Sequence, residues 1–137
     1  MTATPDPTAA DMPLGALCER MGVRLLEARK GRVVATMPVE GNTQPFGVLN
    51  GGASAVLAET LGSIAAALHA GPGRYPVGLD LNCTHHRSVR EGFVTAVATP
   101  LAEGRTIASY DIKVSDDAGR MICSARLTCL IRDINGA

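Results

Sequence analysis

The sequence is poor in aromatic residues and has no excess of charge of either sign. Of its 137 residues, two are Phe, two are Tyr and none is Trp, so we expect a core of aliphatic side chains and alanine. Thirteen basic residues balance thirteen acidic ones, which leaves no positive field for binding a nucleic-acid backbone. Hydrophobic residues make up 46%, and this share together with the length indicates one folded globular domain.

The sequence also lacks an uninterrupted apolar run of the roughly 20 residues that a membrane span needs. Its longest apolar helical candidate carries Glu59 and His69 among several glycines and serines. The opening residues, MTATPDPTAADMP, are polar and contain three prolines, unlike a signal peptide or an anchor. We expect residues 1–12 to be a flexible tail, residues 13–137 to be the single domain, and the protein to be cytoplasmic with no membrane or nucleic-acid partner.

The spacing of cysteines and histidines does not indicate a metal site. No cysteine pair has the CxxC type of spacing, and the adjacent His85 and His86 would point to opposite faces of a strand. We therefore expect no metal and no cofactor. The four cysteines are interpreted as buried thiols: Cys18, Cys83, Cys123 and Cys129.

Hydrophobic periodicity predicts two helices and six strands. Residues 14–22 predict a short helix closed by Gly22, and the runs on either side of Lys30-Gly31 predict a hairpin. Residues 51–70 have helical spacing over about five turns. From Tyr75 onward, short turns separate four strands, which we expect to form one antiparallel meander: residues 76–89, 93–101, 105–116 and 120–133.

The long helix has small residues on several sides and one carboxylate, Glu59. Each glycine inside a helix costs about 1 kcal/mol relative to alanine, so close packing by a curved sheet is the expected reason for them. A lone Glu in a helix is most often solvated or paired with a basic residue. Small apolar neighbours on this helix favour a semi-buried carboxylate instead.

The start of this helix and Glu59 together suggest acyl-transfer chemistry. Asn50 is an acceptable N-cap, and the N–H groups of Gly51 and Gly52 would then be free to bind a developing oxyanion. Glu59 returns to nearly the same face about two turns later, with Ser63 one turn beyond. A carboxylate near a carbonyl held by N–H donors can act as a general base or as a nucleophile.

Two segments, QPFGVLNGGASAVLAETLGS and LDLNCTHHRSVREG, resemble the hotdog-fold acyl-CoA thioesterases. The resemblance is to the Arthrobacter-type 4-hydroxybenzoyl-CoA thioesterase branch, near the enterobactin proofreading and 1,4-dihydroxy-2-naphthoyl-CoA thioesterases, and spans residues 41–130. It implies an α+β hotdog fold, with an antiparallel sheet of five to six strands wrapped around one long central helix. It also implies a homodimer assembling into a homotetramer, with each active site built across a subunit interface.

The resemblance assigns roles to several residues. Glu59 would be the catalytic carboxylate, and the Gly51 N–H would polarise the thioester carbonyl. Gln44 would position the carbonyl or water, Ser63 would support the carboxylate, and Phe46 would lie near the acyl group. The expected contacts of coenzyme A are His85, His86 and Arg87 for its pantetheine and nucleotide, and Gly104, Arg105 and Thr106 for its phosphates.

At one position the chain departs from the family. Members usually read His-Gly-Gly at the helix start, whereas this chain reads Asn50-Gly51-Gly52. An Asn amide can donate to a carbonyl but carries no proton at neutral pH. The departure therefore concerns rate and substrate choice and leaves the fold unaffected.

Three functions are compatible with these residues. The favoured one is hydrolysis of acyl-CoA thioesters, in particular aryl-CoA, to a carboxylic acid and coenzyme A. The second is an acyl-CoA-binding protein with attenuated or no turnover, which Asn50 would support. The third is a hydratase of enoyl thioesters, which would require an Asp and a His acting together at the helix start, and that pair is missing here.

Overall fold

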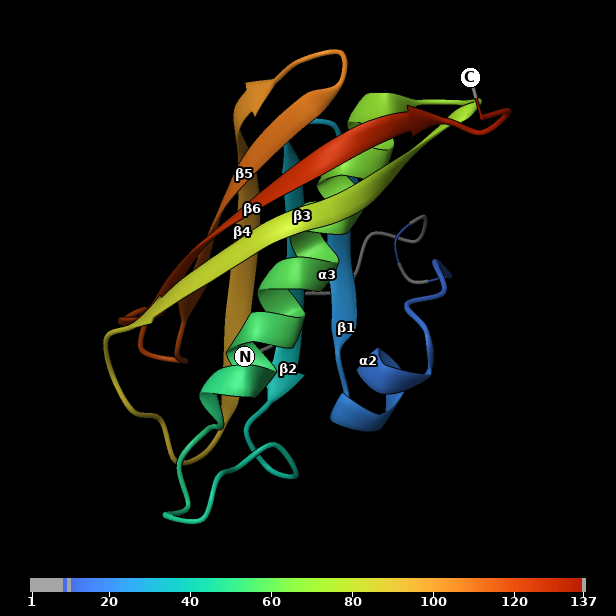
Figure 1. Ribbon diagram of the computed structural model, residues 1–137. Helices are drawn as coiled ribbons and strands as arrows, with labels where there is room; N and C mark the ends of the chain where they lie inside the picture. The colour runs from blue at the N-terminus through green and yellow to red at the C-terminus, as the bar shows by residue number, and fades with distance from the viewer. Residues whose placement is uncertain (1–8, 10, 137) are drawn as a thin grey trace.

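The computed structural model describes residue 9 and residues 11–136 (Figure 1). Most of the predicted tail, residues 1–8 and 10, lies outside the described residues. Within the rest of that segment, Ala9 is buried and Met12 packs against the core.

Six antiparallel strands form one sheet in the order β1-β2-β4-β5-β6-β3, and one long helix packs against it. This is the predicted α+β hotdog architecture. The elements in chain order are α2 (Ala16–Met21), β1 (Arg24–Arg29), β2 (Arg32–Pro38), α3 (Gly51–Ala70), β3 (Arg74–His85), β4 (Phe93–Glu103), β5 (Ile107–Ser115) and β6 (Met121–Asp133).

Local sequence patterns predicted most of these helices and strands correctly. The hairpin around Lys30-Gly31 is confirmed as β1 and β2, and Gly31 adopts the positive φ of 85° that its turn requires. α2 ends where predicted, because Gly22 adopts a left-handed conformation and its N–H bonds to the carbonyls of Cys18 and Glu19.

The prediction of a four-strand meander is wrong for its first strand. β4, β5 and β6 do pair in succession, but β3 pairs with β6, and β4 pairs with β2. The segment between β3 and β4 therefore crosses from one edge of the sheet to its middle. Its backbone is held on the way, since the Val89 carbonyl accepts from Leu49 N–H at 2.8 Å and the Gly92 carbonyl accepts from Val39 N–H at 2.9 Å.

α3 lies in the hollow of the curved sheet and contacts all six strands. Figure 1 shows β3 and β6 crossing in front of the helix, with β1 and β2 behind it. Small residues allow this close approach: a Cβ atom on Gly62 would lie 2.5 Å from Leu127 Cδ2 of β6. The buried positions follow the helical period: Ala53, Ser54, Leu57, Ala58, Leu61, Gly62, Ala65 and Ala66.

The same helix corrects the expectation that no segment is long and apolar enough for a membrane span. α3 has 20 residues, and its best 18-residue window has a mean hydropathy of 1.3, so it is long and apolar enough for a span by length and composition. In the folded chain, 44% of that window is buried against the sheet, which accounts for its apolar character as a core helix.

The core is aliphatic, as predicted, with one aromatic exception among the described residues. Tyr110 of β5 is only 1% exposed, and its hydroxyl donates to Glu103 Oε2 at 2.8 Å. Burial and the adjacent Glu103 carboxylate raise the pKa of Tyr110. Three of the four cysteines are buried, and Cys83 is half-buried.

The two edges of the sheet differ. The β1 edge carries Arg24 and Arg29, and a bulge between Leu25 and Glu27 interrupts its pairing with β2. At the other edge, none of the 12 residues of β3 is buried, and the exposed side chains include Tyr75, Val77 and Leu79. The β3 edge is therefore long, open and partly apolar.

Candidate active site

The N-terminus of α3 presents one free backbone donor. Asn50 is the N-cap, as predicted, and its side-chain oxygen accepts from Gly52 N–H at 2.8 Å. The Gly51 N–H has no acceptor within the described part of the chain. Because a helix N-terminus carries partial positive charge, this N–H can bind a carbonyl oxygen or an oxyanion.

The loop before α3 holds Gln44 beside this donor. The buried Asn42 anchors the loop by donating from Nδ2 to the Met21 and Pro38 carbonyls, each at 2.8 Å. The Gln44 side-chain oxygen accepts from the Phe46 N–H, which leaves its amide NH₂ group able to donate. Phe46 itself is 83% exposed at the tip of the loop.

A cavity of about 340 Å³ opens at the helix start and collects five of the predicted site residues. They are Gln44, Gly51, His85, His86 and Arg87. Asn50 does not line this cavity and faces a neighbouring hollow of about 320 Å³ together with Gly52 and Val56. The Asn50 side chain thus acts locally as a helix cap, on the other side of the helix start from Gln44.

The two adjacent histidines both line this cavity but make different contacts. His85 lies against the helix start, since a Cβ atom on Gly51 would be 2.9 Å from His85 Nε2. His86 turns to the polar face of β6, where its Nε2 lies 2.8 Å from Ser124 Oγ. Only His85 of this pair contacts the glycine that carries the free donor.

Glu59 lies two turns along α3, outside that cavity. Its side chain is half-buried, and its Oε2 atom is buried with no hydrogen-bond partner among the described residues. Gly78 of β3 faces the carboxylate, and Cys129 of β6 lies close enough to sense its charge. Burial, and after it the Glu59 charge, raises the pKa of the Cys129 thiol to about 11.

Within one chain, the predicted site residues fall into three separate places. Glu59 follows Gly51 by eight positions, or about 12 Å along the helix axis, which is too far for both to act on one carbonyl. Ser63 lies one turn beyond Glu59. A carboxylate and an oxyanion donor are thus both present, but they do not converge within one protomer.

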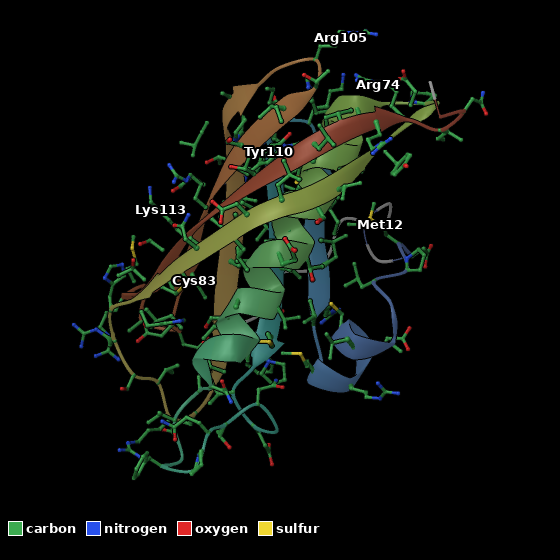
Figure 2. All side chains as sticks on the ribbon, viewed as in Figure 1. Met12, Arg74, Cys83, Arg105, Tyr110 and Lys113 are labelled. Carbon is green, nitrogen blue, oxygen red and sulfur yellow. The ribbon has the colours of Figure 1, made fainter. Side chains whose placement is uncertain are left out.

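The third place is the hairpin between β4 and β5. His69 Nε2, near the C-terminus of α3, lies 2.7 Å from the Gly104 carbonyl oxygen. Gly104, Arg105 and Thr106 are therefore at the other end of a helix about 30 Å long. Figure 2 shows Arg105 on this hairpin with Arg74 near it, whereas Cys83, two residues before His85, lies toward the opposite end of β3.

Sequence reasoning missed several residues that build these places. Asn42 anchors the loop, Ser54 lines the cavity, and Gly78 faces Glu59. Only Asn42 had a local signal, because Asn before a turn often bonds to backbone groups. The other two depend on how β3 is placed against α3.

The similarity to known proteins covers this whole arrangement. The pattern of the Thioesterase superfamily matches residues 46–123. The chain is 42% identical over 119 residues to the proofreading thioesterase EntH of Cronobacter turicensis, covering 86% of this chain and 87% of that protein. The crystal structure of a thioesterase of Haemophilus influenzae is 40% identical with a TM-score of 0.84, over 87% of this chain and 84% of that one. A mutant thioesterase of Pseudomonas aeruginosa is 41% identical with a TM-score of 0.83, over 87% of each chain.

Proposed function

Since the chain belongs to the thioesterase superfamily and is therefore a hydrolase of acyl-CoA thioesters, we propose that it acts on aryl-CoA. In this proposal Glu59 is the catalytic carboxylate, and the Gly51 N–H donates a hydrogen bond to the thioester carbonyl. The resemblance to the 4-hydroxybenzoyl-CoA branch supports the aryl group. Phe46, exposed at the loop tip, offers an aromatic surface that an aryl substrate would stack on.

The observation that carries this proposal is the unpartnered oxygen of Glu59. A buried carboxylate oxygen without a hydrogen bond is destabilising, so its presence in an apolar helix calls for a reason other than folding. Catalysis supplies that reason. The carboxylate either attacks the thioester carbon and displaces the coenzyme A thiolate, forming an anhydride that water then cleaves to the free acid and the restored carboxylate, or removes a proton from the water that attacks the carbonyl and displaces the thiolate.

A second copy of the chain would complete the site. The donor at Gly51 and the carboxylate at Glu59 are about 12 Å apart in one protomer. Pairing of two open β3 edges in antiparallel fashion would bring the Glu59 region of one protomer toward the helix start of its partner. We propose a homodimer of this kind, and two such dimers in a homotetramer.

The remaining residues receive supporting roles in this arrangement. The Gln44 amide would donate to the carbonyl or to water, and Ser63 would support the carboxylate one turn away. Coenzyme A would extend from the cavity beside His85 along His86 and Arg87. Gly104, Arg105 and Thr106 would contact its phosphates where the partner subunit brings that hairpin close.

The test is release of free thiol from a panel of aromatic, short aliphatic and long aliphatic CoA thioesters. We expect turnover of the aromatic thioesters and its loss in Glu59→Gln, which keeps the side-chain size and removes the charge. Native activity in Glu59→Gln would rule out the catalytic role of the carboxylate. Preference for long aliphatic thioesters would rule out the aryl-CoA proposal alone.

Asn50 motivates a second candidate, an acyl-CoA-binding protein with attenuated turnover. Its side-chain oxygen is engaged by Gly52 N–H, and the side chain faces away from the cavity that Gln44 lines. An Asn50→His variant measured in parallel separates the two functions. Recovery of turnover only in that variant would favour the attenuated form.

A further inference from the structure

Gly78 of β3 lies directly against the Glu59 carboxylate. A Cβ atom at position 78 would be 3.0 Å from Glu59 Oε1 and 3.3 Å from Oε2. Contacts this short are tighter than ordinary packing, so the carboxylate would have to move by a few tenths of an ångström. The space that the carboxylate occupies therefore exists because residue 78 has no side chain.

The backbone does not require glycine at this position. Ten glycines in the described chain have a positive φ, and Gly78 is not one of them. A glycine inside a strand weakens it, because the residue gains entropy on unfolding and packs no side chain. The remaining physical reason for a glycine at this position is that it leaves space for the Glu59 carboxylate.

The surrounding strands fit the same interpretation. Gly78 pairs with Cys129 of β6, and the register shifts between Gly78 and Asp80, so that Leu79 forms a bulge. The Glu59 carboxylate lies at this paired position, since its Oε1 and Oε2 atoms are 3.0 and 3.3 Å from where a Cβ atom on Gly78 would be. Bulges commonly change the direction of a strand beside a functional site.

We propose that Gly78 is a positioning residue that sets the location of the Glu59 carboxylate by shape. The carboxylate has no hydrogen bond to hold Oε2, so the wall formed by Gly78 fixes how far it approaches β3. A side chain at residue 78 pushes the carboxylate away from its working position. The inference rests on the proposed catalytic role of Glu59.

A size series tests the proposal kinetically. We expect kcat to fall about 10-fold in Gly78→Ala and about 100-fold in Gly78→Val, with KM within about 3-fold, because small displacements of a catalytic group are costly. The melting temperature should stay equal or rise, since alanine and valine restrict the unfolded chain more than glycine does. A merely structural glycine would give the reverse pattern, with a lower melting temperature and a retained kcat.

Two further variants separate position from packing. In a Glu59→Asp background the carboxylate is withdrawn by one methylene, so adding Gly78→Ala should lower kcat by less than about 2-fold. Gly62→Ala is the matched control, because its added methyl meets Leu127 and no catalytic group. That variant should lose stability with no selective loss of kcat, and a native kcat in Gly78→Val would overturn the proposal.

Crystal structures of the native, Gly78→Ala and Gly78→Val proteins provide a test that is independent of turnover. We expect the Glu59 carboxylate to be displaced from its native position, and further in the valine variant. A carboxylate that stays in place in both variants overturns the inference. Absence of turnover in the native protein would sink the proposed function alone, since the crystal structures still decide where the carboxylate lies.

Discussion

Asn50 lies at the start of α3, and its side chain caps this helix. Its oxygen accepts from Gly52 N–H at 2.8 Å. Removing that acceptor leaves a helix N–H unpaired, so Asn50→Ala should lower the free energy of unfolding by about 1 kcal/mol. Asn50→Asp keeps an acceptor at the same place and serves as the control in urea unfolding. Equal stabilities of the two variants would argue against the cap.

Residue-level features were predictable where they depend on near neighbours in the sequence. The Asn-Gly-Gly order indicated the cap and the free Gly51 donor, and the helical period put Glu59 on a half-buried face. The expectation that the Gly52 N–H is free as well is wrong, because the Asn50 side chain accepts from it. The contact between Glu59 and Gly78 was not predictable. These two residues are 19 positions apart and meet because β3 packs against α3. No local sequence pattern indicates that packing.

At the scale of elements, the fit between α3 and β6 depends on Gly62. Helix propensity favours alanine over glycine by about 1 kcal/mol. The added methyl, however, would lie 2.5 Å from Leu127 Cδ2, and overpacking of a core costs typically 1–3 kcal/mol. Gly62→Ala should therefore be destabilised in thermal unfolding, against its propensity, and a Leu127→Ala background should relieve the effect. A stabilised single variant would contradict this packing.

The turn between β5 and β6 depends on Asp116. Its carboxylate accepts from Ala118 N–H and Arg120 N–H and pairs with Arg120 Nε at 2.9 Å, and these bonds lower its pKa from the usual 3.8. The stabilisation is therefore complete above pH 3.8 and is lost as the pH falls through the lower folded pKa. Asp116→Asn should lower the melting temperature at pH 7 and flatten its dependence on pH below 4. A variant with the native acid profile would exclude this contribution.

Element boundaries could be read closely from the sequence, but one pairing could not. Periods of 3.6 and 2 and the turn glycines located α3, the first hairpin and the β4-β5-β6 meander. β3 was assigned to the wrong neighbour, because its paired residues in β6 lie 38 to 59 positions away and the periodicity of a strand does not indicate its partner. The candidate site divides for a different reason, because Gly51 and Glu59 lie about 12 Å apart along α3.

For the whole molecule, the proposed division of each site between two copies makes a prediction about mixed dimers. Glu59→Gln and Gln44→Ala proteins, each impaired alone, should regain about a quarter of native activity when mixed after unfolding and refolding together. Half of the dimers would be mixed, and one of their two sites would combine native Glu59 with native Gln44.

Thiol release and native mass spectrometry of the mixture measure activity and the share of mixed dimers. If both residues acted within one chain, every site in a mixed dimer would still carry one substitution. Activity of the mixture would then stay at the average of the two variants, even with mixed dimers present.

The unequal edges of the sheet would also limit growth of the proposed assembly. In the proposed dimer, strand pairing at β3 would leave a doubled sheet whose two outer edges are both β1, with its arginines and its bulge. Neither outer edge can easily accept another strand, so polymerisation through the sheet stops after one addition. Replacing both arginines, as in Arg24→Thr with Arg29→Thr, removes one of these two protections, so this variant should add further strands at β1 more readily than the native chain.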